Sequence, residues 1–133
     1  METIDEFSLR RYKDKAGVYF IKCYDGVIKI GCSHDVYSRL TSYSGVYWQN
    51  QILKIWTCNS PLFLEQQLHL VLGIELKQIR KGKYELFKLN ETDEQNLEQI
   101  IQKVDERALE IMRQMDEAVN QNFDEDVSAQ IAN

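Results

Sequence analysis

The stretch GVYFIKCYDGVIKIG, residues 17–31, decides the fold of this 133-residue chain. Two runs rich in β-branched and aromatic residues flank the turn signal YDG at 24–26. An Asp-Gly pair between two such runs is among the strongest short-range signals for a β-hairpin. The stretch therefore predicts two antiparallel strands joined by a tight turn.

The length of that turn decides which side chains share a face of the hairpin. If residues 24–26 form a three-residue loop with Gly26 left-handed, Cys23 lies opposite Val27. Tyr19 and Lys29 then point to the same face, because side chains alternate along a strand. A two-residue loop would shift the register by one and separate Tyr19 from Lys29. With the longer loop, the face that reads as core consists of Val18, Phe20, Ile28 and Ile30.

A short helix is expected next, over about residues 35–43. Ser33 and Asp35 are both candidate N-caps for it. Arg39 and Tyr43 are four residues apart and so share one face of this helix. Tyr43 belongs either to the same site as Arg39 or to the packing beneath the helix.

The sequence QILKIWTC, residues 51–58, predicts a third strand, and Ser60-Pro61 predicts the start of a helix. This helix is expected to run to about Leu72 and to be closed by Gly73. Glu65 and His69 lie four residues apart on one of its faces. His69 either hydrogen-bonds in a site or supports Glu65 as a helix neighbour.

Residues 77–83 form a basic, loop-like segment, followed by a short extended segment at 84–89. Clustered positive charge is suited to contact with phosphate, although a solvated loop explains it equally well. The basic residues of this segment are Lys77, Arg80, Lys81 and Lys83.

A long helix is expected from Thr92 to about residue 121, with Thr92 and Gln95 as a capping box. Its apolar residues follow a heptad seam over 97–118, made of Leu97, Ile101, Val104, Ala108, Ile111, Met115 and Ala118. Such a helix is roughly 45 Å long, which exceeds what a compact domain covers. The seam either packs on the sheet in its first half or forms a homodimer. Residues 122–133 are expected to be a disordered or lightly docked tail.

Charge is divided unequally along the chain, whose net charge is -5. Residues 1–90 hold 13 Lys/Arg and 9 Asp/Glu, whereas residues 91–133 hold 3 and 12. The first part can therefore present a basic face to a nucleic acid. The three cysteines form no CxxC pair, which favours a cytoplasmic or other reducing compartment over a disulfide framework. No apolar run is long enough to span a membrane, so a membrane is not an expected partner.

The sequence GVY at 17–19, followed by KIG at 29–31, resembles the paired signature of the GIY-YIG nuclease superfamily. The resemblance continues with an Arg eight residues after the second glycine, an aromatic residue four positions later, and a helical Glu in LFLEQQLH. These residues are Arg39, Tyr43 and Glu65. The KIG motif and the later YELF look most like the phage and prokaryotic branch. The match covers about residues 16–90.

The resemblance implies an α+β fold, with a small three-stranded antiparallel sheet flanked by helices, to which the long C-terminal helix is added. It implies metal-dependent hydrolysis of DNA phosphodiesters by a domain of residues 1–90. Tyr19 would act on the attacking water, Arg39 would bind the scissile phosphate, and Glu65 would hold a single Mg²⁺ or Mn²⁺. Gly17 and Gly31 match the structural glycines of the two motifs.

Elementary chemistry agrees with those residue types. A carboxylate suits a hard divalent ion, and a guanidinium suits phosphate oxygens. Lys29 stands where much of the family has a second tyrosine, although some restriction enzymes of the family are similar in having lysine there. An ammonium beside Tyr19 would lower the pKa of that phenol. The expected function is a metal-dependent DNA endonuclease. The alternatives are a catalytically weak DNA-binding module of the same fold and an interaction protein that works through its acidic helix.

Overall fold

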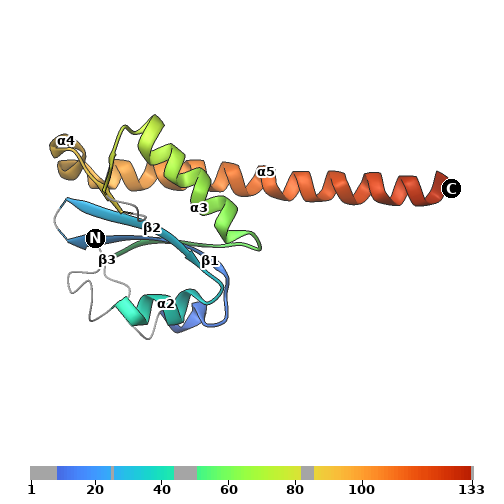
Figure 1. Ribbon diagram of the computed structural model, residues 1–133, viewed down its shortest axis with the longest axis horizontal. Helices are drawn as coiled ribbons and strands as arrows, with labels where there is room; N and C mark the ends of the chain where they lie inside the picture. The colour runs from blue at the N-terminus through green and yellow to red at the C-terminus, as the bar shows by residue number, and fades with distance from the viewer. Residues whose placement is uncertain (1–8, 25, 44–50, 82–85, 133) are drawn as a thin grey trace.

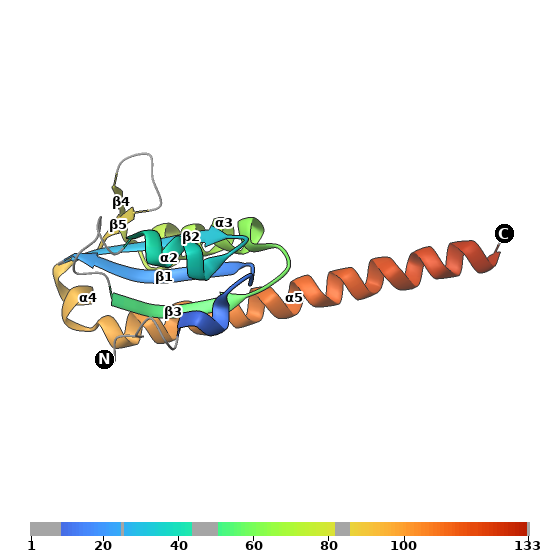
Figure 2. The ribbon, with the colours of Figure 1, turned by 90° about the horizontal axis from the view of Figure 1, so that it is seen from below.

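The computed structural model describes residues 9–24, 26–43, 51–81 and 86–132. Its fold is α+β, with an open five-stranded antiparallel sheet in the order β3-β1-β2-β5-β4. The strands are β1 (Gly17–Tyr24), β2 (Val27–Ser33), β3 (Gln51–Thr57), β4 (Ile79–Lys81) and β5 (Leu86–Lys88). The helices are η1 (Arg10–Tyr12), α2 (Val36–Ser42), α3 (Pro61–Leu70), the π-helical η3 (Val71–Glu75), α4 (Glu91–Gln95) and α5 (Leu97–Ala132). Helix α2 lies on one face of the sheet, and α3 and α5 lie on the other (Figure 1 and Figure 2).

The β1–β2 hairpin has the register that places Tyr19 and Lys29 on one face. Tyr19 pairs with Gly31, and Ile21 pairs with Lys29. The turn differs from the expected three-residue loop, because Tyr24 pairs with the residue that follows Gly26. A bulge between residues 22 and 24 places one extra residue in β1. This residue compensates for the shorter loop, so the rest of the hairpin has the register expected of a three-residue loop. Gly26 has a φ of 73°, a left-handed conformation that favours glycine.

Each face of the sheet has its own apolar cluster, as the alternation of the hairpin predicts. The larger cluster joins one face of the sheet to α3 and α5, and its strand members include Val18, Phe20, Ile28 and Ile30. The smaller cluster joins the other face to α2, and includes Tyr19, Ile21, Cys23, Val36 and Leu40. Because both faces are covered, the side chains of Tyr19 on β1 and Lys29 on β2 lie inside the domain rather than on its surface.

The sheet has two more strands than the three-stranded expectation. Residues 79–81, which read as part of a basic loop, form β4 and pair with β5. Both strands are short, and β5 contacts β2 only at Val27–Lys29. Among the described residues, no strand lies beside the rest of this edge of β2, and α3 contacts β2 from the face that it covers (Figure 2).

Helix α3 begins as expected and ends differently. Pro61 occupies its first turn, where the missing N–H costs nothing. The expectation that Gly73 closes the helix is wrong, because the chain continues through it as the wider turn η3. The backbone N–H of Leu76 donates to the Val71 carbonyl at 2.9 Å, and Lys77 then takes a left-handed φ of 54°. The conformation that glycine favours after a helix is thus adopted four residues later, by a lysine.

The expected capping box at Thr92 is also wrong. The cap is Asn90, whose side chain accepts a hydrogen bond from the backbone N–H of Asp93 at 2.7 Å. The helix that it begins, α4, ends at Asn96, whose φ of -111° and ψ of 38° interrupt the helical backbone. The long helix α5 starts only after this break.

Helix α5 completes the core of the domain with its first half. The heptad positions Val104, Ala108 and Ile111 are buried in the larger cluster, while Leu97, Ile101 and Met115 pack against it. The Trp56 indole N–H donates to Asp105 at 2.8 Å, which ties α5 to β3. Beyond the domain, α5 projects as a helix through Ala132, including the stretch expected to be a loose tail (Figure 1). Within the described residues, no helix is long and apolar enough to cross a membrane.

Candidate functional site

Two tyrosines meet on the α2 face of the sheet. Tyr19 comes from β1, and Tyr43 is the residue that ends α2. Their hydroxyl oxygens are 2.7 Å apart, and their rings meet edge to face with centroids 5.8 Å apart. This oxygen–oxygen distance is typical of a good O–H···O hydrogen bond. Tyr19 is fully buried whereas Tyr43 is partly exposed, so Tyr43 is the more accessible member of the pair.

Lys29 joins this pair from β2. Its side chain is only 7% exposed, which is unusual for lysine, because burial of a charge is costly without compensation. Its ammonium lies over the ring of Tyr43, 5.2 Å from the centroid, where the face of the ring attracts a cation. The charge also acts on Cys23, whose pKa is raised to about 11 by burial and is lowered in part by Lys29. Tyr19, Lys29 and Tyr43 are therefore brought together, as the hairpin register predicted for the first two.

Helix α2, which Tyr43 ends, also carries Arg39. Arg39 is exposed on the last turn of the helix, four residues before Tyr43. The start of α2 is fixed by Asp35, which accepts a hydrogen bond from the Ser38 backbone N–H at 3.1 Å. That hydrogen bond holds the pKa of the Asp35 carboxyl below its usual value. Of the two candidate caps, Asp35 is the N-cap, and Ser33 hydrogen-bonds to the backbone of Asp35.

A second group lies on α3 against the edge of β2. Glu65 is only 4% exposed, and its carboxylate is 3.6 Å from Nε2 of His69. The same Nε2 is 2.8 Å from the carbonyl oxygen of Ile30, just beyond the described pairing of β2 with β5. A carbonyl only accepts, so Nε2 must carry a proton and donate it there. His69 is thereby held in one tautomer, with Phe87 against its ring at a centroid distance of 5.5 Å.

The two groups flank the same short segment of β2. Lys29 and Gly31 point to the face that holds Tyr19, while the Ile30 carbonyl between them binds His69 from the edge. The strand thus links the tyrosine–lysine group to the Glu65–His69 pair through neighbouring residues. The sequence did not predict that the Ile30 carbonyl accepts a hydrogen bond from His69, or that Phe87 packs against the His69 ring. The YELF motif pointed toward Phe87, whereas a backbone carbonyl has no sequence signal.

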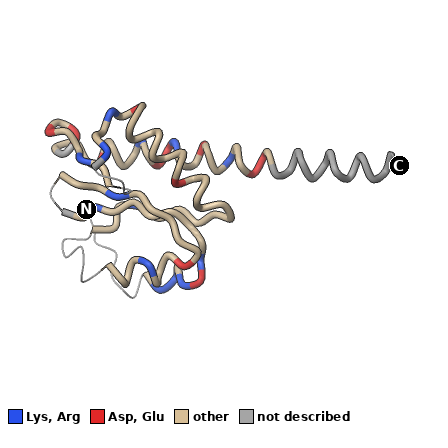
Figure 3. The backbone as a smooth tube through the Cα atoms, in the orientation of Figure 1, with Lys and Arg blue, Asp and Glu red and all other residues tan. Residues whose placement is uncertain are grey.

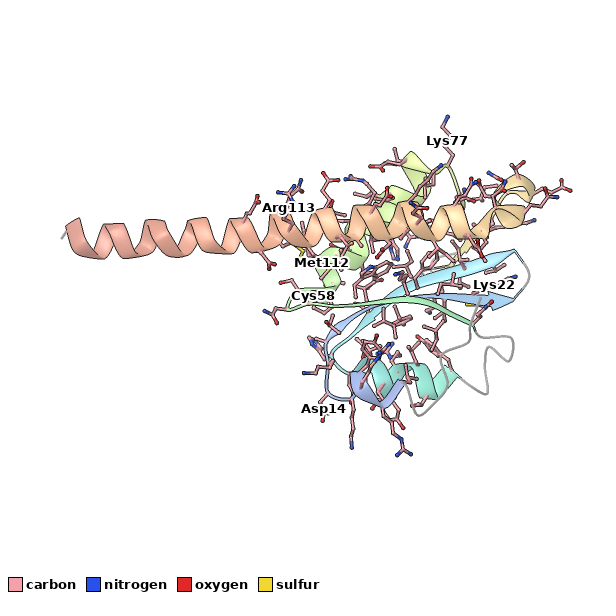
Figure 4. The ribbon with its side chains drawn as sticks, turned by 180° about the vertical axis from the view of Figure 1, so that it is seen from behind. Asp14, Lys22, Cys58, Lys77, Met112 and Arg113 are labelled. Atoms are coloured by element: carbon pink, nitrogen blue, oxygen red, sulfur yellow. The ribbon has the colours of Figure 1, made fainter. Side chains whose placement is uncertain are left out.

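The predicted basic patch is described only in part. Lys77 and Arg80 are exposed, and Lys77 projects away from the domain (Figure 4). Lys83 lies outside the described residues, as does the side chain of Lys81. Lys and Arg positions also occur around η1 and α2, so positive charge is present at more than one end of the domain (Figure 3).

The first motif glycine has a clear structural role. A Cβ atom at Gly17 would lie 2.4 Å from the carbonyl oxygen of Trp56 on β3. Glycine at this position therefore allows β1 and β3 to approach each other. Gly31 is buried and pairs with Tyr19 across the hairpin.

Comparison with known proteins identifies the family. Residues 16–106 match the model of the T5orf172 domain, and the chain belongs to that family. The match extends into α5, in agreement with the buried residues that this helix adds to the core. No curated protein and no solved structure matches the chain significantly.

Proposed function

We propose that this chain is a metal-dependent DNA endonuclease of the GIY-YIG type. Tyr19 and Lys29 activate water, Arg39 holds the phosphate, and Glu65 binds one divalent ion. The observation that carries the proposal is the buried ammonium of Lys29 over a tyrosine that is hydrogen-bonded to a second one. T5orf172 domains are associated with phages and are often linked to nuclease-like, GIY-YIG-related proteins, which supports the same class.

The tyrosine pair is suited to take a proton from water. A phenol of ordinary pKa, about 10, is a poor base at neutral pH. In this proposal the nearby charge of Lys29 favours ionisation of Tyr19, and Tyr43 donates its hydroxyl proton in a hydrogen bond to that anion. Because Tyr19 is fully buried and Tyr43 is partly exposed, water reaches the pair from the side of Tyr43. The proton leaves the attacking water for the phenolate. The resulting hydroxide forms a bond to phosphorus as the bond from phosphorus to the leaving sugar oxygen breaks, and that oxygen then takes up a proton.

Arg39 supplies the charge that holds the phosphate. Its guanidinium is permanently positive and offers paired N–H donors to the non-bridging oxygens. The side chain is exposed on α2, so DNA can reach it without any change in the fold. Its position one helical turn before Tyr43 brings the bound phosphate to the exposed side of the tyrosine pair.

Glu65 fits a single hard ion. Among the described residues, no group of three His, Cys, Asp or Glu side chains gathers into a metal cage. Mg²⁺ commonly binds proteins through one or two carboxylates and keeps water and phosphate oxygens in its other positions. Such an ion would stabilise negative charge on the phosphate and the leaving oxygen. Since Nε2 of His69 donates its proton to the Ile30 carbonyl, that nitrogen does not coordinate the ion.

The alternative is a DNA-binding module of the same fold with little or no catalysis. The full burial of Tyr19 favours it, because a buried hydroxyl acts on substrate only through a more exposed neighbour. In that case Arg39, Lys77 and Arg80 would suffice for binding, and the buried tyrosines would only stabilise the domain.

Cleavage of plasmid DNA tests the proposal. We expect nicking in Mg²⁺ or Mn²⁺ and none in EDTA. Glu65→Gln and Arg39→Ala should each reduce the rate by about 100-fold or more. Glu117→Gln and Arg113→Ala are matched controls on the projecting side of α5, where both side chains are exposed, and should leave the rate unchanged.

Two further variants separate catalysis from binding. Tyr19→Phe and Tyr43→Phe remove one hydroxyl each and should slow cleavage while DNA affinity stays constant. Pure protein that binds duplex or branched DNA but cuts none of it with any divalent ion would favour the binding module. Unchanged cleavage by Glu65→Gln would rule out the proposed metal ligand.

A further inference from the structure

Helix α3 and its extension η3 have an outward face made of large apolar side chains. Leu62, Phe63, Leu70 and Ile74 are between 48% and 69% exposed. Their spacing places them on one side of the helix, because residues three, four, seven and eight apart share a stripe. The opposite side, with Leu64, Leu68 and Leu72, is buried in the core. We call the exposed stripe, with Gln66 between its members, the α3 face.

The α3 face lacks charge. Between residues 61 and 74 the only ionisable side chains are Glu65 and His69, and both are turned toward the sheet. A surface helix normally carries charged residues on its outer side, whereas a helix that is apolar all round is normally covered on all sides. An exposed face without a charge, on an otherwise ordinary soluble domain, indicates a surface that another molecule covers.

We propose that the α3 face binds a second copy of this chain through a two-fold axis. Side chains of about 150–250 Å² each, roughly half exposed, leave about 400 Å² of apolar surface on the face. A standard interface buries about 800 Å² per partner, with an apolar centre and a polar rim. The α3 face supplies a centre of suitable size.

Self-association suits this face better than any other described surface. In a two-fold interface the same surface of both copies meets. A charged residue near the axis therefore lies close to the identical residue of the other copy, and the two charges repel. The α3 face avoids that cost, and Gln66 in its middle both donates and accepts hydrogen bonds. In α5, by contrast, the heptad seam up to Met115 already packs on the chain's own core. The outer side of α5 carries charges at positions such as Arg107, Glu110 and Arg113.

The test is the mass of the full chain in solution, measured by sedimentation or light scattering over a wide concentration range. Neither metal nor DNA takes part, so the measurement is made in EDTA. We expect a concentration-dependent dimer, and Leu70→Glu should weaken it by at least about tenfold. Leu109→Glu on α5 is the matched control, because Leu109 is 54% exposed and Leu70 is 52% exposed. That control should dimerise like the wild type.

Circular dichroism and thermal unfolding show whether each variant is folded, and Leu62→Glu repeats the test at the other end of the face. A wild-type chain that remains monomeric at the highest concentration overturns the proposal. So does a folded Leu70→Glu variant that still dimerises. Equal loss of the dimer in Leu109→Glu would assign the interface to α5 instead.

Discussion

Replacing Gly17 with alanine tests the close approach of β1 and β3 that positions Tyr19. A Cβ at position 17 would lie 2.4 Å from the carbonyl oxygen of Trp56 and 3.1 Å from the Cα of Thr57. Both atoms belong to the backbone of β3, so no side-chain rotation relieves the contact. The two strands must instead move apart locally by about 0.6 Å or more before the contact becomes tolerable.

The expected cost follows from that movement. Overpacking of a well-packed core costs about 1–3 kcal/mol, and one weakened ladder hydrogen bond adds about 1 kcal/mol. The free energy of unfolding should therefore fall by about 2–4 kcal/mol, which corresponds to a decrease in Tm of about 6–16 °C for a domain of this size. Thermal and denaturant unfolding followed by circular dichroism measure both quantities.

Gly73→Ala is the matched control, because it makes the same substitution where there is room. Its nearest neighbour would be Cε1 of Phe87 at 3.9 Å, an ordinary contact. Since alanine is favoured over glycine within a helix, this variant should be neutral or more stable by up to about 1 kcal/mol. If the free energy of unfolding of Gly17→Ala lay within about 0.5 kcal/mol of the wild-type value, the steric reasoning would be refuted.

Three further predictions concern stability. Asn90→Ala should cost about 1 kcal/mol in denaturant unfolding because it removes the cap of α4, whereas Thr92→Ala should change little; the reverse order would restore the sequence-based capping box. Asp105→Ala should cost about 1–3 kcal/mol, because the buried end of Trp56 loses its acceptor and α5 loses a tie to β3; an unchanged unfolding curve would contradict this. Burial raises the pKa of Cys23 from 9.0 to about 11, so the unfolded thiol ionises first and stability should fall as the pH rises between these values. In Cys23→Ala this part of the pH dependence should be absent, and an identical slope in both proteins would rule out Cys23 as its source.

Much of the candidate site was predictable because it depends on local periodicity. Under the three-residue loop, the alternation of side chains along a strand placed Tyr19 with Lys29, and helical spacing placed Glu65 with His69. The predictions were wrong where a different local backbone conformation produced the same pairing of residues. At the hairpin a bulge and a shorter turn produced the register expected of a longer loop.

The helix ends show a second kind of limit. Gly73 carries the usual stop signal, yet the helix passes through it and ends after a wider turn. Thr92 has the spacing of a cap, but Asn90 is the cap. The backbone N–H of Asn90 donates to the side-chain oxygen of Gln78, and this contact from an earlier part of the chain fixes Asn90 at the start of the helix. Local signals compete with one another, and tertiary contacts decide between them.

The sequence by itself determined the α+β class, the hairpin, and the family-like order of Arg39 and Glu65. These follow from residue types and spacings within single elements. Only the tertiary structure showed that Tyr43 pairs with Tyr19, and that His69 binds the Ile30 carbonyl of β2. It alone showed that the seam of α5 is covered as far as Met115, while the outer face of α3 is not. The physical reason is that such contacts join segments far apart in the chain. Whether a face is buried depends on which other elements pack against it.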